Sequence, residues 1–269
     1  MPNSQMPNSD SRTPEPNAFD PNRAPTDDTP STRRSDNPLP FILPFILFMV
    51  IASRYPDFAG SYDENIVPQV TVETWQYIIM IGVQVLVAAG LLGYFRKTYL
   101  QHFPFRVSPL SIGVGIVGIV LWIALCELGL ELKLFVMLGF DVSRPAFNPF
   151  TIPDQSVRWL FFISRFSLLA IVVPIVEELF VRGWFARWFH DPSWENIKLT
   201  GLPMKTLLAV SLYGVLTHPG EAIAAFVWFG LVSWLMNRTG NLWDCVVAHA
   251  VTNFLLGIYV VWFSQWQHW

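Results

Sequence analysis

Charged residues are scarce in this chain of 269 residues: Asp, Glu, Lys and Arg make up 14% of it, whereas hydrophobic residues make up 52%. Soluble domains carry about 25% charged residues, so a folded surface of this composition is poorly suited to water. The net charge of -3 is small, and no basic cluster alternates with aromatic residues. A nucleic-acid groove requires such a cluster, so we expect no nucleic-acid partner.

Cysteine is nearly absent, and the start of the chain lacks large apolar side chains. Cys126 and Cys245 lie in or beside apolar segments, so we expect no disulfide framework. Residues 1–38 are rich in Pro, Ser, Asn and Asp, and such a segment buries too little surface to offset its ordering entropy. It also has no apolar core of a cleavable signal peptide. We therefore expect a disordered tail over residues 1–38 and a membrane domain over residues 39–269.

Long apolar runs fill the rest of the chain. About 20 apolar residues cross the hydrocarbon core of a bilayer as a helix, so these runs predict an all-α, polytopic bundle of about seven transmembrane helices. Pro40 and Pro44 interrupt the first run, which is short, and its full crossing of the bilayer is left open. The seven candidate spans are residues 39–53, 75–95, 110–130, 159–188, 204–217, 222–236 and 242–263.

The distribution of Lys and Arg between the loops predicts the orientation of the bundle. With the N-terminus in the cytoplasm, nine basic residues face inward and four face outward. Basic loops stay on the cytoplasmic side, so we expect a cytoplasmic N-terminus, in a bacterial inner membrane. The inward residues are Arg33, Arg34, Arg96, Lys97, Arg106, Arg187, Lys198, Lys205 and Arg238, and the outward ones are Arg54, Lys133, Arg144 and Arg158.

A pair of carboxylates, Glu177-Glu178, lies inside the fourth run. Ionisable groups at bilayer depth are costly and indicate function. Glu178 and Arg182 are four residues apart and share a helix face, so Arg182 is expected to hold the Glu178 carboxylate ionised and oriented. Glu177 is rotated by about 100° from its neighbour, which leaves it available for proton transfer.

Two histidines and an amide follow in the later runs. His218 ends the fifth run, and His249 lies four residues before Asn253 on one face of the last. Hydrolysis of an amide by water needs a base to take a proton from water and donors to stabilise the oxyanion. A carboxylate, two imidazoles and an amide could meet these needs without a serine or cysteine nucleophile.

The series Glu-Glu-x-x-x-Arg, a span-ending His, and His-x-x-x-Asn resembles the CAAX protease and bacteriocin-processing family of intramembrane endopeptidases. The resemblance covers a catalytic core of about residues 159–257 and extends to the branch associated with exosortase sorting systems. It implies that Glu177, helped by His218, activates water and that His249 and Asn253 bind the oxyanion. Glu178 and Arg182 would organise the site, and the substrate would be a membrane-associated precursor or sorting-signal peptide.

The sequence departs from the family at one position and leaves two questions open. The family has an aromatic residue four positions before the His of its second motif, where this chain has Gly214, with Tyr213 one residue earlier. No cofactor is required, although Glu177, His218 and His249 could bind zinc, since catalytic zinc sites use three such ligands and a water. The alternative to an enzyme is a membrane scaffold or an immunity-type protein that binds a peptide without cutting it.

Overall fold

The computed structural model describes residues 37–55, 72–130, 133, 137 and 147–268. The expected disordered tail over residues 1–38 lies outside these residues except for its last two. The described residues belong to one compact unit, and the description below concerns that unit. Its described residues form helices and contain no β-strand.

The helical prediction is confirmed. Five helical segments are long and apolar enough to cross a membrane, and two apolar helices, Leu39–Ala52 and Met204–Thr217, are shorter. The protein is therefore an integral membrane protein. The α-helices of the described residues are α1 (Leu39–Ala52), α2 (Val72–His102), α3 (Pro109–Leu128), α5 (Gln155–Ser167), α6 (Val173–Phe180), α7 (Ala186–His190), α8 (Met204–Thr217), α9 (Ala222–Thr239) and α10 (Leu242–Phe263).

Local signals explain where several helices begin and end. The Asp154 side chain accepts a hydrogen bond from the backbone N–H of Val157 and caps α5. Asn241 caps α10 in the same way, just after Gly240 ends α9 with a φ of 64°. By contrast, α2 does not end at Phe95 as expected but runs to His102, because Arg96 and Lys97 can extend their charged ends to water from within a helix.

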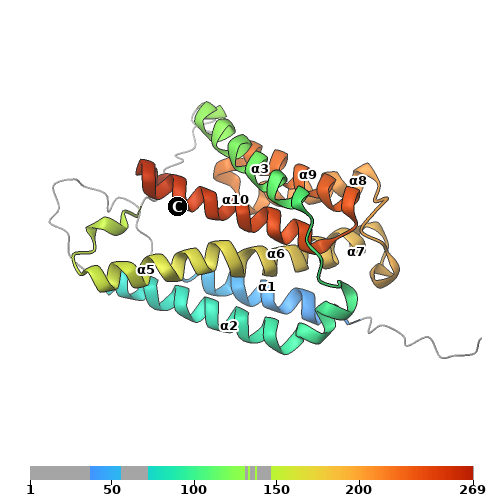
Figure 1. Cartoon of the computed structure of the whole chain (residues 1–269), viewed down its shortest axis with the longest axis horizontal. Coiled ribbons are helices and arrows are strands. Elements are labelled where there is room, and N and C mark those ends of the chain that lie inside the picture. Colours follow the sequence, from blue (N-terminus) through green and yellow to red (C-terminus); the bar gives the residue numbers. More distant parts are fainter. Residues whose placement is uncertain (1–36, 56–71, 131–132, 134–136, 138–146, 269) are drawn as a thin grey trace, which may run out of the picture. The chain divides into compact units, whose positions relative to one another are not determined.

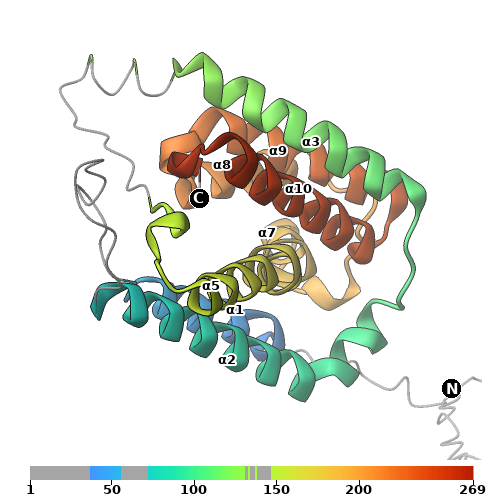
Figure 2. The ribbon, with the colours of Figure 1, turned by 60° about the vertical axis from the view of Figure 1, so that its left-hand side comes forward.

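The helices form two groups (Figures 1 and 2). In one group α1 and α2 pack against each other and against the α5–α6 segment, and in the other α3, α8, α9 and α10 lie together, with α6 contacting α10 between the groups. Small residues let α3 approach α10 closely: a Cβ on Gly115 would lie 2.7 Å from the Ala248 carbonyl oxygen and from Val251. Such small-residue contacts are typical of membrane helices.

Candidate active site

The carboxylate pair lies on a helical segment that is interrupted twice by π-turns. Residues Gln155–His190 run as one apolar segment of 36 residues, in which π-helical turns at Leu168–Val172 and Val181–Phe185 flank α6. In the first turn the N–H of Val173 bonds to the carbonyl of Leu168, five residues earlier. Each π-turn inserts about one residue into the helix, and such turns are frequent at functional sites.

Glu178 is fully buried and contacts two side chains, Arg182 and His249. Its Oε2 accepts from Nη1 of Arg182 at 2.5 Å, and both side chains are 0% exposed. Its Oε1 lies 3.0 Å from Nδ1 of His249. Arg182 is held on its other side by the Phe229 carbonyl, which accepts from Nη2 at 3.1 Å. Helical spacing thus forms the expected pair, and the fold adds His249 to it.

Glu177 turns away from this pair, as the rotation between neighbours requires. Its Oε1 accepts from the hydroxyl of Tyr213 at 3.1 Å. Its Oε2 lies 3.9 Å from Nε2 of His249, which is too far for a direct hydrogen bond. The two atoms can therefore share a water or substrate oxygen between them.

His249 lies between the two carboxylates and uses a different nitrogen toward each. A carboxylate can only accept hydrogen bonds when ionised, so the contact with Glu178 requires a hydrogen on Nδ1. The indole of Trp228 packs edge-on to the His249 ring at 4.6 Å between centroids. Trp228 is itself fixed, because its Nε1 donates to the Thr252 hydroxyl at 3.2 Å. The imidazole is thus held in one orientation, with Nε2 toward Glu177.

His218 follows the last residue of α8. Its Nδ1 lies 3.2 Å from the carbonyl oxygen of Gly214 and 3.0 Å from the hydroxyl of Thr217. Since the carbonyl only accepts, this contact requires a hydrogen on Nδ1, and in the neutral ring Nε2 is then a proton acceptor. The rings of Trp122 and Phe229 flank the imidazole at 5.6 and 5.9 Å.

The short length of α8 explains how His218 reaches the depth of Glu177. At 1.5 Å per residue, the 14 residues of α8 span about 21 Å, less than the hydrocarbon core, whereas the 36-residue segment spans about 54 Å. The end of α8 therefore falls inside the bundle, and His218 and Glu177 line the same cavity.

Asn253 lies one helical turn after His249 on α10. Its Nδ2 donates to the carbonyl of Leu169 at 3.0 Å, within the first π-turn. An amide nitrogen has two hydrogens, so the second can serve a bound molecule. The π-turn therefore contributes directly to the site by orienting this side chain.

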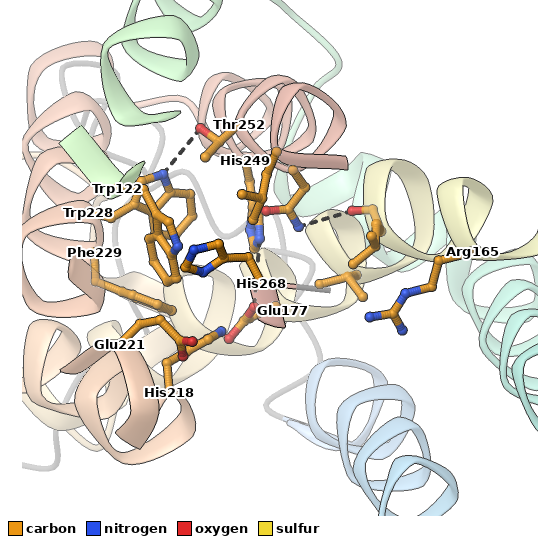
Figure 3. A pocket seen from close by; sticks show the side chains of 14 residues that line it. Trp122, Arg165, Glu177, His218, Glu221, Trp228, Phe229, His249, Thr252 and His268 are labelled. Atoms are coloured by element: carbon orange, nitrogen blue, oxygen red, sulfur yellow. Dashed lines mark hydrogen bonds and ion pairs between the residues drawn. The ribbon is translucent and has the colours of Figure 1, made fainter. Parts of the chain in front are cut away.

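A cavity of about 270 Å³ brings these groups together (Figure 3). Glu177, His218, His249 and Asn253 all line it, while Glu178 and Arg182 lie behind its wall. The cavity is thus a partly polar chamber inside an apolar bundle. Its lining is completed by Trp122, Arg165, Leu169, Val173, Glu221, Trp228, Phe229, Thr252, Leu256 and His268.

The zinc alternative receives no geometric support. Within the part of the chain that the structure describes, no three side chains of His, Cys, Asp and Glu are grouped so that they could hold a metal ion. Glu177, His218 and His249 line one cavity but do not form such a group.

The departure at Gly214 has a packing explanation. A Cβ at this position would lie 2.3 Å from the ring of Phe229, so the ring of a residue on α9 occupies the space beside the backbone of α8. The neighbouring Tyr213 packs against Phe180 and Phe229 and points its hydroxyl at Glu177. Sequence reasoning noted Tyr213 but missed this contact, because the contact joins two helices.

Trp122, Trp228 and Arg165 were also missed. The two indoles flank the histidines from α3 and α9, and tryptophans near span ends are ordinarily assigned to the membrane interface. Arg165 was not singled out as a site residue from the sequence, yet its side chain lines the cavity. A charged residue inside a membrane span is the signal that could have indicated this position.

A comparison with protein families matches residues 159–255 to an Rce1-like family, the type II CAAX prenyl endopeptidase Rce1-like proteins. The match supports the CAAX protease and bacteriocin-processing family, which implies CAAX-type intramembrane peptidase activity in general. The catalytic core expected at residues 159–257 stays a prediction. The narrower exosortase-associated branch stays a prediction. Comparisons with curated proteins and with solved structures gave no match.

Proposed function

We propose that this chain, a member of the CAAX protease and bacteriocin-processing family by its residues 159–255, is an intramembrane endopeptidase in which Glu177 activates water. One observation carries the proposal. Of two adjacent carboxylates, Glu178 is bound to Arg182 and His249, whereas Glu177 lines the cavity beside His249 and His218. Separate environments are how two neighbouring carboxyl groups take different roles.

In the proposed reaction, a water in the cavity gives a proton to Glu177, and its oxygen attacks the carbonyl carbon of the substrate peptide. Tyr213 holds Oε1 of Glu177, so Oε2 faces the water. His218 assists through Nε2, since its Nδ1 is directed to the Gly214 carbonyl. The C–N bond then breaks, and the proton passes from Glu177 to the leaving amine.

His249 and Asn253 are the proposed donors to the oxyanion. This role requires a hydrogen on Nε2 of His249, and the contact with Glu178 requires one on Nδ1. Both ring nitrogens of His249 would then carry a hydrogen while the oxyanion is bound, with the carboxylates of Glu177 and Glu178 on either side of the ring. Asn253 adds the N–H that is not used by Leu169. One donor of this type contributes about 3 kcal/mol to stabilising a transition state.

The substrate we infer is a membrane-associated precursor or sorting-signal peptide, because the cavity lies within the apolar bundle and is lined by tryptophans as well as polar groups. We further infer a bacterial inner-membrane location with the N-terminus in the cytoplasm, which rests on the nine inward and four outward basic residues.

The test is proteolysis by purified protein in lipid vesicles, with three peptide classes as probes: a prenylated C-terminal peptide, a bacteriocin leader peptide and a sorting-signal peptide. Glu177→Gln should abolish cleavage without loss of membrane insertion. Glu127→Gln is the matched control, because Glu127 is exposed on α3 and contacts Tyr259 rather than the cavity. Wild-type cleavage by Glu177→Gln would refute the role of Glu177.

Chelation in this assay and the biological function of the Glu177→Gln variant in cells separate the alternatives. Full activity after extensive chelation is expected for water activated by Glu177, and loss of activity that zinc restores would favour the metal mechanism. A biological function that survives Glu177→Gln would favour the membrane scaffold or immunity-type protein.

A further inference from the structure

Arg165 lies on the wall of two neighbouring cavities. Beside the cavity of the candidate active site, a second one of about 230 Å³ is lined by residues of α1, α2, α8 and the carboxylate-bearing segment. Glu177 and His218 line both cavities, and so do Arg165, Leu169 and Val173. The two chambers therefore share one wall, with Arg165 at one end and Glu177 at the other.

The first π-turn explains why Arg165 faces the same way as Glu177. In a regular α-helix, residues twelve positions apart are rotated by about 120°. The π-turn at Leu168–Val172 inserts about one residue, so the twelve residues from Arg165 to Glu177 advance only as far around the axis as eleven residues of a regular α-helix. The rotation between the two side chains therefore falls to about 20°. The residues between them on this face, Leu169 and Val173, line both cavities as well.

The positive charge of Arg165 acts on Tyr55, a residue of the second cavity. Burial raises the pKa of the Tyr55 hydroxyl, and the positive charge of Arg165 opposes that rise. Tyr55 lines the second cavity together with Arg165. A guanidinium in a membrane span is costly, and a planar fork of donors suits a carboxylate.

We propose that Arg165 binds the free carboxylate at the C-terminal end of the substrate, a role that rests on the proposed endopeptidase function. The Cα atoms of Arg165 and Glu177 are separated by about 16 Å along the helix axis, from eleven steps of 1.5 Å. An extended peptide advances about 3.3 Å per residue. Allowing for the reach of the arginine side chain, the scissile bond lies about three to five residues from the bound carboxylate. Glu221 also lines the catalytic cavity. Its negative charge would repel the substrate carboxylate if that group were bound near His218.

The experiment compares one peptide in two forms, a prenylated cysteine followed by four apolar residues, ending either in a free carboxylate or in an amide. Wild-type protein in vesicles should cleave the acid about 10- to 100-fold more efficiently than the amide, mainly through KM. Arg165→Gln should cleave both forms alike, at the rate of the wild-type protein on the amide. Arg158→Gln is the control, because Arg158 lies on the same helix, donates to the Ile152 carbonyl and lines neither cavity.

Binding separates this proposal from the proposed function. In the Glu177→Gln background, fluorescence anisotropy should show tighter binding of the acid, and adding Arg165→Gln should remove the difference. This result together with no cleavage by wild-type protein would uphold Arg165 and refute the endopeptidase.

Three outcomes would overturn the role of Arg165. The first is equal binding of the acid and the amide, including no binding of either. The second is a loss of both forms on Arg165→Gln, which would indicate a structural role. The third is peptide binding that requires anionic lipid in the wild-type protein but not in Arg165→Gln, while the acid and the amide bind equally well. This result would indicate that Arg165 binds a lipid phosphate.

Discussion

Replacing Arg182 tests how the site is held together. Arg182→Met substitutes an unbranched apolar side chain and leaves the Glu178 carboxylate buried, with His249 as its remaining hydrogen-bond partner. Breaking a buried ion pair from one side costs about 3–5 kcal/mol, because an uncompensated charge is left behind. Both partners are 0% exposed, so water cannot solvate the carboxylate that remains.

The other contacts of Arg182 add little to this cost. The Phe229 carbonyl loses the donor at 3.1 Å, but it also accepts from the Ser233 hydroxyl at 2.7 Å and stays satisfied. The guanidinium also lies 5.5 Å from the centre of the Phe229 ring, and such a contact contributes about 1 kcal/mol. The expected total is therefore dominated by Glu178.

The assay is thermal unfolding of the detergent-solubilised protein, followed by tryptophan fluorescence. A loss of about 4 kcal/mol lowers Tm by on the order of 10 °C for a chain of this size. Arg238→Met is the control, since Arg238 is exposed in the last turn of α9.

A double variant identifies the cause. Adding Glu178→Gln to Arg182→Met removes the unpaired charge, while the amide oxygen can still accept from Nδ1 of His249. We expect the double variant to melt several degrees above Arg182→Met. If Arg182→Met melts within about 2 °C of the wild-type protein, or if the double variant is less stable than the single one, the reasoning fails.

Two further substitutions test contacts beside the pair. Tyr213→Phe keeps the ring but removes the hydroxyl that donates to Glu177, so kcat/KM should fall about 10-fold with little change in Tm; unchanged kinetics would contradict an orienting role. Gly214→Ala places a methyl 2.3 Å from the Phe229 ring and should cost about 1–3 kcal/mol. Gly90→Ala, whose added Cβ has nothing within 4 Å, should stabilise α2 by up to about 1 kcal/mol, and the opposite ranking in melting curves would refute the packing account.

Local rules predicted the helices well where the chain carries clear end signals. The expected spans at residues 204–217 and 242–263 have the bounds of α8 and α10, because Pro203 and Pro219 flank the first and Asn241 caps the second. The prediction failed at Phe95, since a basic pair can mark the membrane surface without ending the helix.

Contacts of the site that lie within one helix could be predicted from residue spacing, but contacts between helices could not. The pairing of Glu178 with Arg182 follows from their separation by four residues, and the structure forms it. The hydrogen bond between His249 and Glu178 joins residues 71 positions apart in the sequence. The hydrogen bond from Tyr213 to Glu177 joins residues 36 positions apart. Such contacts depend on helix packing, which no local pattern encodes.

The π-turns mark a different limit. A sequence read at 3.6 residues per turn places Arg165 about 120° from Glu177, and on that count the arginine belongs on another face of the helix. The inserted residue at Leu168–Val172 removes most of this rotation and also orients the Leu169 carbonyl that binds Asn253. The π-turn thus brings Arg165 and Glu177 onto the shared wall of the two cavities. No pattern of side chains in the sequence predicts this turn.

One imidazole connects the two carboxylates and therefore connects stability with chemistry. Nδ1 of His249 is held by Glu178 at 3.0 Å, while Nε2 of the same ring lies 3.9 Å from Glu177. The ring is planar, so a change in the contact at Nδ1 turns Nε2 as well. Arg182 lines neither of the two cavities, yet it orients Glu178 and through it His249. Substitutions at Arg182 should accordingly lower kcat even in protein that remains folded.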